Sequence, residues 1–196
     1  MQTIVLASSN PGKLKEFNQL LAGVGFAVKP QSDYNVSDAD ETGLSFVENA
    51  ILKARNACRA TGLPALADDS GIEVDALNGR PGIYSARFAG IGASNASNNE
   101  QLLRELENVA EQDRTARYQC VLVYMRHAED PTPIICQGSW EGRILSAPAG
   151  DGGFGYDPLF YVPTHKCAAA ELSKDEKGKI SHRAAALKLL LAQLTQ

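Results

Sequence analysis

Two adjacent aspartates follow a short apolar run in the first half of the chain. Asp68 and Asp69 stand in the stretch ADDSG, residues 67–71, directly after the apolar residues 63–66. Two like charges in a partly buried place repel each other, and each loses hydration. A cation would stabilise them, so the pair suggests a metal or basic site. The alternative is a polar turn at the end of a strand, because Asp, Ser and Gly are common turn residues.

A polar loop near the N-terminus has the composition of a phosphate site. Residues 8–13 read SSNPGK between a predicted strand and a predicted helix. Backbone amides, the helix dipole and the ammonium of Lys13 could together hold phosphate oxygens there. The spacing is not that of a Walker motif. A plain helix-capping turn is the alternative, because Ser and Asn are good caps.

Two further groups place charged side chains near helix starts. Glu41 and Lys53 flank the start and the shoulder of one predicted helix, and Lys177 precedes Ser181-His182-Arg183 at another. A carboxylate near a helix N-terminus is commonly a dipole partner, and helix lysines are commonly solvated. Clustered donors at a helix start are also compatible with a solvated polar face. Each group therefore supports a functional site only in combination with the others.

A glycine-rich loop precedes two aromatic residues and a carboxylate. Gly150, Gly152, Gly153 and Gly155 surround the stretch FGYDP, residues 154–158. Glycines let a backbone approach a ligand closely, an aromatic ring can stack on a base, and a carboxylate accepts hydrogen bonds from ring nitrogens or ribose. The alternative is an ordinary loop with two core aromatic residues.

Apolar periodicity predicts the elements that position these groups. Helix-spaced apolar residues, one with Ser45 and Glu48 at capping-box spacing, predict helices at residues 13–22, 44–59 and 98–106 and a closing helix that ends near residue 194. Ser181 could cap the closing helix. Strands are predicted at residues 3–7, 63–75, 118–125 and 134–145, the last two as an antiparallel pair. Helices mixed with short and long strands predict an α/β fold around a mixed sheet.

Composition limits the classes of function. The 196 residues, 44% of them hydrophobic and 21% charged, suit one domain over residues 1–196, and the net charge of −4 argues against a broad surface for nucleic acid or anionic membrane. The four cysteines lack metal-ligand or C-x-x-C spacing, so free thiols in a reducing compartment are expected. No basic leader or segment of roughly 18 apolar residues is present. We expect a cytoplasmic protein with neither nucleic acid nor membrane as partner.

Taken together, these groups supply phosphate donors, metal carboxylates, a stacking ring and donors for a base edge, which suggests an enzyme of nucleoside triphosphates. Residues 8–13, 41–53, 67–71, 154–158 and 181–183 resemble, in this order, the motif series of the inosine triphosphate pyrophosphatase family. The resemblance spans nearly the whole chain. One departure is Ser8, where the family commonly has threonine, and the hydroxyl is retained.

The resemblance implies a homodimeric, magnesium-dependent enzyme with an elongated mixed β-sheet flanked by helices and two lobes with the active-site cleft between them. Such an enzyme cleaves ITP, dITP and XTP to the monophosphate and pyrophosphate, and so cleanses the nucleotide pool. The implied substrate-binding loop comprises Ser8, Ser9, Asn10, Pro11, Gly12 and Lys13, of which Ser8, Asn10 and Lys13 would hold the triphosphate. Lys53 would lie near the phosphates and Ser70 against the nucleotide. Glu41 and Asp69 would bind Mg²⁺, and Asp69 is also the presumed proton acceptor. Because an isolated Asp has a pKa near 3.9 and is a weak base at neutral pH, Asp69 would alternatively orient a metal-polarised water. The implied base pocket comprises Phe154, Gly155, Tyr156, Asp157, Lys177, His182 and Arg183.

Selectivity would follow from the oxygen at position 6 of hypoxanthine and xanthine, where adenine carries an amino group. Buried donors aimed at that oxygen would face donors when ATP binds, and this mismatch can be worth a few kcal/mol. Two alternatives remain. One is a related house-cleaning pyrophosphatase that acts on other modified nucleotides. The other, from a different class, is a nucleotide-binding sensor without turnover.

Overall fold

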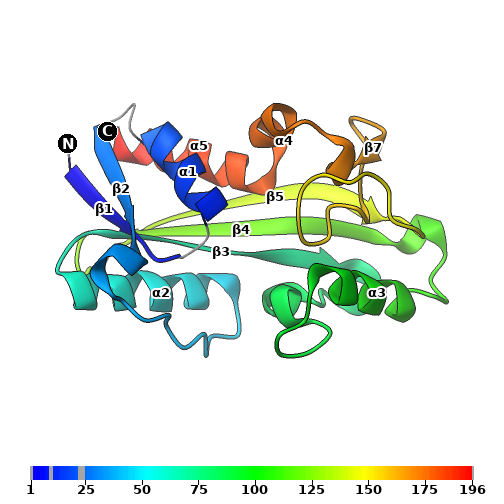
Figure 1. The fold of residues 1–196 in the computed structure, drawn as a ribbon, viewed down its shortest axis with the longest axis horizontal. Coiled ribbons are helices and arrows are strands. Elements are labelled where there is room, and N and C mark those ends of the chain that lie inside the picture. Colours follow the sequence, from blue (N-terminus) through cyan, green and yellow to red (C-terminus); the bar gives the residue numbers. More distant parts are fainter. Residues whose placement is uncertain (1, 9–10, 22–24, 196) are drawn as a thin grey trace. The chain divides into compact units, whose positions relative to one another are not determined.

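The computed structural model describes residues 2–8, 11–21 and 25–195 (Figure 1). Strands and α-helices alternate up to residue 125, after which three further strands precede two helices. The strands are β1 Gln2–Leu6, β2 Phe26–Pro30, β3 Ala65–Val74, β4 Thr115–Met125, β5 Ile134–Ile144, β6 Phe160–Val162 and β7 Cys167–Ala168. The helices are α1 Pro11–Leu21, α2 Phe46–Thr61, α3 Asn95–Glu105, α4 Lys174–Ile180 and α5 His182–Leu194. The expected α/β class is confirmed.

Within the described residues, seven strands form one mixed sheet in the order β2-β1-β3-β4-β5-β6-β7. β1 is parallel to both β2 and β3, whereas β6 is antiparallel to β5 and to β7. Side-chain bonds join Arg117 to Glu141 and Gln119 to Ser139. Residue numbers therefore rise in β4 as they fall in β5, which is the predicted antiparallel pairing.

The chain divides into two compact units. Unit 1 comprises residues 1–69, 120–137 and 186–196, and unit 2 comprises residues 70–119 and 138–185. β3, β4, β5 and α5 each contribute residues to both units. Each unit has a hydrophobic cluster of its own.

The core of unit 1 is built from β-branched and leucine side chains of its strands with apolar faces of its helices. Ile4 and Leu66 in the strands pack in one cluster with Phe17 of α1 and Leu187 of α5. Figure 1 shows α1 and α5 on one side of these strands and α2 on the other. The alanine-rich face of α2 is buried and allows the helix to lie close to the strands. This packing holds α1 and α2, and hence their lysines, against the sheet.

The core of unit 2 is richer in aromatic residues. Tyr118 and Trp140 from the sheet cluster with Tyr156 and Phe160, and α3 adds Leu102. Aromatic side chains bury large areas and favour tilted or offset contacts, as seen between Trp140 and Phe160 at 5.2 Å between ring centroids. The strands of unit 2 therefore present rings beside the candidate base-recognition residues.

Several predicted boundaries differ from the structure for local reasons. α1 begins at Pro11, two residues earlier than predicted, because proline is favoured in the first turn of a helix. Its predicted last residue, Ala22, lies outside the described residues. α3 begins three residues early because Ser94 caps it by accepting from the backbone N–H of Ser97. The Ser45 cap of α2 and the Ser181 contact to α5 are both present.

Two features of the structure depart further from what the sequence suggested. β3 continues through Asp68, Asp69 and Ser70 to Val74, so the polar-turn interpretation of this stretch is wrong. α4 was not predicted, because its seven residues carry no apolar stripe. Its start is stabilised by a capping box between Ser173 and Glu176.

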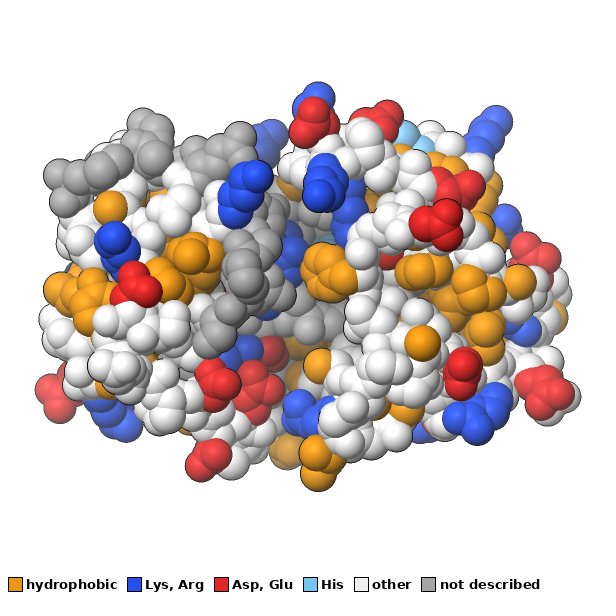
Figure 2. All heavy atoms as spheres, viewed as in Figure 1, with side chains coloured by type: hydrophobic (Ala, Val, Ile, Leu, Met, Phe, Trp, Pro, Cys, Tyr) orange, Lys and Arg blue, Asp and Glu red, His pale blue; other side chains and the backbone are white. Residues whose placement is uncertain are grey.

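The composition argument concerned charge, thiols and membrane-spanning segments. Figure 2 shows basic and acidic side chains interspersed over the face that it presents. All four cysteines are free thiols, as predicted. None of the described helices combines the length and the apolar character needed to cross a membrane.

Candidate active site

The position of the two aspartates follows from the alternation of side chains in β3. Successive residues of a strand point to opposite faces of its sheet, so Asp68 and Asp69 project to different faces. Both are buried, and they expose only 1% and 8% of their surface. Buried carboxylates require partners. Each of the two has a different lysine.

Asp68 is held by a lysine and a thiol. Lys13, in the first turn of α1, donates to Oδ1 of Asp68, and the thiol of Cys120 in β4 donates to Oδ2 at 3.6 Å. The Asp68 side chain is fully buried, while Lys13 keeps 20% of its side chain exposed. Asp68 therefore anchors the ammonium of Lys13, whose side chain remains partly exposed to solvent.

Asp69 shares the ammonium of Lys53 with Glu41. Nζ of Lys53 lies 2.6 Å from Oδ1 of Asp69 and 2.9 Å from Oε1 of Glu41. Lys53 comes from the second turn of α2, whose alanine face is buried. The loop before α2 supplies Glu41, which is the most exposed of the three side chains. Two carboxylate oxygens thus converge on one positive charge.

Burial and pairing act in opposite directions on this cluster. Burial alone would lower the pKa of Lys53, but the charges and hydrogen bonds of Asp69 and Glu41 outweigh it and raise that pKa. Burial raises the pKa of Asp69, and the charge of Lys53 offsets this only in part, while Glu41 and Asp68 add to the rise. Lys53 is therefore firmly cationic, and Asp69 is a better proton acceptor than an isolated aspartate.

The carboxylates also bear on the expected metal. Among the described residues, no group of three or more His, Cys, Asp or Glu side chains is placed to hold a metal ion. Glu41 and Asp69 form a set of two, with the ammonium of Lys53 at the point where their oxygens converge. Magnesium in nucleotide enzymes is commonly held by one or two carboxylates, with substrate phosphates and water as its other ligands. The donor set fits such an ion.

In unit 2, the candidate base-recognition residues are organised by Asp157. Its Oδ2 accepts from Nζ of Lys177 and, at 2.8 Å, from the backbone N–H of Phe154, while Oδ1 accepts from the hydroxyl of Tyr118 at 3.2 Å. The ammonium of Lys177 lies 4.9 Å from the centre of the Phe154 ring, and that ring is 57% exposed. This group therefore offers an open aromatic face beside a positive charge.

The glycines of this loop are required at one position in particular. Gly153 has φ of +72°, and a Cβ atom there would lie 2.1 Å from Oδ2 of Asp157. Gly153 thus allows the loop to pass directly over the carboxylate.

The other predicted site residues have varied surroundings. Tyr156 is buried and donates to the carbonyl of Ser85 at 2.8 Å, so its ring belongs to the core while that of Phe154 is exposed. His182 and Arg183, the first two residues of α5, are also buried. Ser70 is half-buried in β3, and Gly155 has φ of +63°.

The predicted phosphate loop is described in part. Ser8 is half-buried and follows β1, while Pro11 and Gly12 begin α1 ahead of Lys13. Ser9 and Asn10 lie outside the described residues.

Sequence reasoning missed two residues that contact the site. Cys120 and Tyr118 lie on one face of β4 and contact Asp68 and Asp157, respectively. The alternation of β4 shows that they share a face, but it does not show which residues of other elements lie opposite.

Comparison with known proteins bears on the family. The model of the Ham1 family matches residues 4–193. The dITP/XTP pyrophosphatase of Thioalkalivibrio sulfidiphilus is 61% identical over 191 residues, which are 97% of each chain. That of Shigella flexneri is 57% identical over 194 residues, 99% of this chain and 98% of the relative. The chain belongs to the Ham1 family. This confirms the resemblance carried by the five motifs.

Solved structures of Ham1 proteins have the same fold. A HAM1 protein from Coxiella burnetii is 50% identical, with a TM-score of 0.96 over 100% of this chain and 99% of the other. A nucleoside-triphosphatase / dITP/XTP pyrophosphatase from Mycobacterium abscessus is 39% identical, with a TM-score of 0.81 over 97% and 99% of the two chains. The mixed α/β fold of this Ham1 family member is therefore shared with its relatives.

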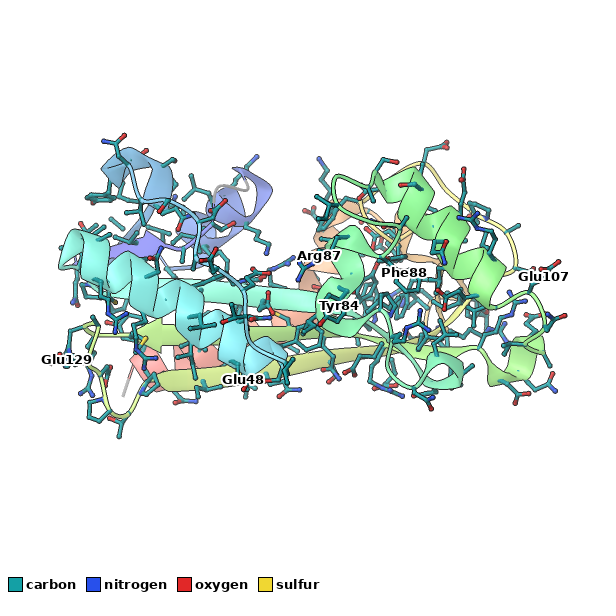
Figure 3. The ribbon with its side chains drawn as sticks, turned by 90° about the horizontal axis from the view of Figure 1, so that it is seen from below. Glu48, Tyr84, Arg87, Phe88, Glu107 and Glu129 are labelled. Atoms are coloured by element: carbon teal, nitrogen blue, oxygen red, sulfur yellow. The ribbon has the colours of Figure 1, made fainter. Side chains whose placement is uncertain are left out.

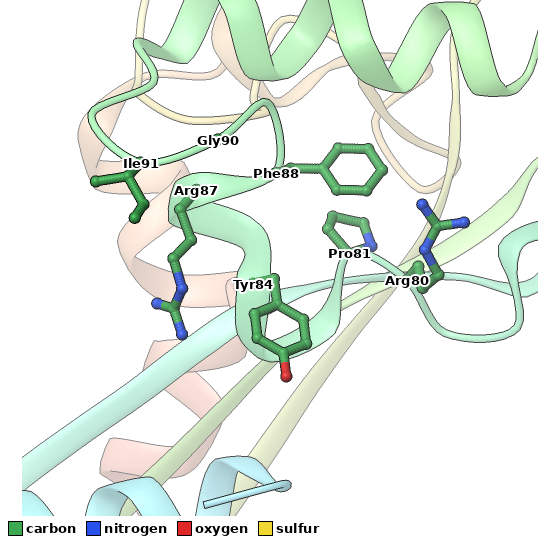
Figure 4. A pocket seen from close by; sticks show the side chains of 7 residues that line it. All are labelled: Arg80, Pro81, Tyr84, Arg87, Phe88, Gly90 and Ile91. Carbon is green, nitrogen blue, oxygen red and sulfur yellow. The ribbon is translucent and has the colours of Figure 1, made fainter. Parts of the chain in front are cut away.

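A pocket of about 310 Å³ in unit 2 is lined by residues that the sequence analysis did not assign to the site. It is lined by Arg80, Pro81, Tyr84, Arg87, Phe88, Gly90 and Ile91. Figure 3 shows that Tyr84, Arg87 and Phe88 come from one short segment, and Figure 4 shows the side chains of Tyr84 and Arg87 extending side by side. The guanidinium of Arg87 lies 5.2 Å from the centre of the Tyr84 ring. Ile91 is fully exposed.

Proposed function

We propose that this protein hydrolyses the non-canonical purine nucleoside triphosphates dITP, ITP and XTP to the nucleoside monophosphate and pyrophosphate. The observation that carries the proposal is the cluster in which Lys53 bridges Glu41 and Asp69, together with the ion pair between Lys13 of α1 and Asp68, the neighbour of Asp69 in β3. This combination of lysines and carboxylates suits a substrate with several negative charges. Full-length relatives named dITP/XTP pyrophosphatases support the same conclusion.

The phosphate groups would be held from unit 1. Lys13 lies in the first turn of α1, where backbone amides and the helix dipole add to its positive charge. Ser8, Ser9, Asn10, Pro11 and Gly12 complete the loop in this proposal. The ion pair with Asp68 keeps the ammonium of Lys13 in place. Lys53 supplies a second positive charge near the phosphates.

Glu41 and Asp69 would hold Mg²⁺, because their oxygens already converge on a cation. The bound ion would supply charge neutralisation for the triphosphate. Asp69 would accept the proton of the attacking water as the phosphoanhydride bond breaks and pyrophosphate leaves. Its raised pKa, caused chiefly by burial, suits this role better than the ordinary value near 3.9.

The base would be recognised by residues of unit 2. Phe154 offers an exposed ring for stacking, and Lys177 lies over that ring. Donors from Lys177, His182 or Arg183 would bond the oxygen at position 6 of the purine. ATP would present an amino group there, leaving buried donors opposed to donors. Gly155, Asp157 and Tyr156 shape the pocket, and Ser70 lies against the nucleotide.

We also include a homodimer and a cytoplasmic location in the proposal. The four free thiols suit a reducing compartment. The patch formed by Tyr84, Arg87 and Ile91 is the surface that we assign to the second copy of the chain. Tyrosine and arginine are enriched at protein interfaces, and a fully exposed isoleucine gains from being covered.

The experiment that tests the function is release of pyrophosphate from ITP, XTP, dITP, ATP, GTP and dTTP, with magnesium and with EDTA. We expect release from the first three that depends on magnesium. Release from dTTP, the pyrimidine nucleotide among the six, would favour the related house-cleaning enzyme. Binding of ITP without any release would favour the sensor.

A further inference from the structure

Asp157 and His182 of the candidate base pocket both contact Tyr118, which lies outside the sequence motifs. The hydroxyl of Tyr118 donates to Oδ1 of Asp157 at 3.2 Å. The ring of the same tyrosine is stacked on His182, with 4.8 Å between ring centroids and an interplanar angle of 12°. All three residues belong to unit 2 and are buried. Tyr118 thus connects the carboxylate of one loop to the imidazole at the start of α5.

The hydroxyl contact completes the fixation of the Asp157 carboxylate. Its other oxygen, Oδ2, accepts from Lys177 and from the backbone N–H of Phe154. With donors on both oxygens, the plane of the carboxylate is determined and cannot rotate freely. Because the same carboxylate anchors Lys177 over the Phe154 ring, the orientation set by Tyr118 extends to the exposed stacking surface.

The ring contact fixes the plane of His182. Trp140 is also nearly parallel to the imidazole, at 6.4 Å and 18°, and it lies 6.2 Å from Tyr118 at 23°. Three nearly parallel rings leave the imidazole little freedom to tilt. A hydrogen-bonding group discriminates between bases only when its direction is set before the base arrives.

The protonation of Tyr118 suits this role. Burial raises the pKa of its hydroxyl well above the usual range, and the negative charge of Asp157 raises it further. The phenol therefore keeps its proton and acts as a donor to the carboxylate.

We propose that Tyr118 is a positioning residue for base selection, which orients Asp157 through its hydroxyl and His182 through its ring. This inference rests on the proposed function, because it assigns the base pocket to the same residues. It adds a specificity-determining side chain from the middle of β4, outside the five motifs.

Two substitutions separate the hydroxyl from the ring. Tyr118→Phe keeps the stack and removes the bond to Asp157, and Tyr118→Leu removes both. For Tyr118→Phe we expect the KM for ITP to rise about fivefold and kcat to stay within about twofold of wild type. The ratio of kcat/KM for ITP to kcat/KM for ATP should fall by about the same factor. Tyr118→Leu should narrow that ratio further.

A spectroscopic signature reports the ring contact without reference to turnover. The ring current of Tyr118 should shift the imidazole proton resonances of His182. We expect the shift to persist in Tyr118→Phe and to be lost in Tyr118→Leu. Tyr124→Phe is the matched control, because it removes the same atom from another buried tyrosine of β4 that belongs to the core of unit 1. It should leave the KM, the ratio and the His182 resonances unchanged.

The outcomes of these experiments distinguish a failure of this inference from a failure of the proposed function. Wild-type protein that releases no pyrophosphate from ITP would overturn the proposed function and the selectivity role together. If the wild type hydrolyses ITP and Tyr118→Phe has an unchanged ratio of kcat/KM for ITP to kcat/KM for ATP, only the role of the hydroxyl is overturned. A lower melting temperature with equal losses on every nucleotide would show a merely structural tyrosine and also overturn the inference. Unmoved His182 resonances in Tyr118→Leu would remove the role of the ring.

Discussion

Asp68 and Asp69 are neighbours in β3, yet their carboxylates bind different lysines. Asp68 pairs with Lys13 of α1, and Asp69 pairs with Lys53 of α2. The cause is the alternation of a strand, which sends the two side chains to opposite faces of the sheet. The repulsion expected between adjacent acids is thereby relieved by two separate cations. The two aspartates should consequently differ in what they do.

Substitution of Asp69 tests its assignment as proton acceptor. Asp69→Asn keeps the size of the side chain but removes its charge and its capacity to take a proton. We expect kcat for ITP to fall about 100-fold or more, because general-base contributions are commonly of that size or greater. Pyrophosphate release measures the loss, and thermal melting checks that the fold is retained. Activity near that of wild type would exclude Asp69 from the reaction.

Substitution of Lys13 should affect both binding and stability. Lys13→Ala removes a phosphate donor and leaves the buried charge of Asp68 without its ammonium, so we expect a KM at least about tenfold higher and a loss of about 2 kcal/mol in the free energy of unfolding. The double variant Lys13→Met with Asp68→Asn removes both charges. Urea unfolding should show that the double variant regains much of the lost stability. Initial rates should show that its KM for ITP remains high. An unchanged KM in Lys13→Ala would argue against the phosphate loop.

The sequence could predict this site only as a set of separate groups. Strong periodicity identified β1 and α2, and the motif order identified Asp69, Lys53 and Glu41 as candidates. The pairing of lysines with aspartates could not be predicted, because the Lys13–Asp68 hydrogen bond joins residues 55 positions apart in the sequence. Such contacts depend on the order of strands in the sheet, which local patterns do not encode.

The missed helix shows a different limit. α4 carries charged residues on all sides and has no apolar face, so periodicity could not reveal it. Its capping box, with Ser173 three residues before Glu176, was visible in the sequence but was not used. Tyr118 was missed for the opposite reason, since a buried aromatic residue in a strand looks like ordinary core.

Acid should selectively weaken the connection between β4 and β5. Hydrogen bonds from the Arg126 side chain, and from backbone N–H groups there and at Thr132, hold the pKa of buried Asp130 well below its usual range. A lowered folded-state pKa means that the stabilisation is present above the unfolded value near 3.9 and is lost as the pH falls through the folded value.

Asp130→Asn should therefore be less stable than wild type at pH 7, and the difference should shrink below about pH 4. Urea unfolding at pH 7, 4 and 3 measures this difference. Asp151→Asn, at an exposed aspartate, is the control and should match wild type throughout. A difference for Asp130→Asn that is constant with pH would contradict the assigned cause.

The proposed dimer surface predicts a change of mass on substitution of Ile91. Ile91→Asp places a charge at a fully exposed position, so the fold should be unaffected while an apolar contact with a second copy is lost. Light scattering should give about twice the monomer mass of 21.0 kDa for wild type and a shift toward the monomer for the variant. Leu189→Asp, at a half-exposed leucine of α5, should leave the mass unchanged. A monomeric wild type would exclude the dimer.

The glycine-rich loop makes a prediction that separates backbone strain from a specific collision. Gly153 and Gly79 both have positive φ, so alanine at either position costs about 1 kcal/mol of stability. Only at Gly153 would the new Cβ meet Asp157, at 2.1 Å, whereas nothing lies within 4 Å at Gly79.

Because Asp157 holds Lys177 over Phe154, Gly153→Ala should displace the carboxylate and disturb base recognition. We expect a higher KM for ITP and a narrower ITP-to-ATP ratio in Gly153→Ala, and neither change in Gly79→Ala. Melting curves should show similar losses from strain in the two variants, with an added loss at Gly153 from the collision. Equal kinetic behaviour of the two variants would mean that the position of Asp157 does not control the choice of base.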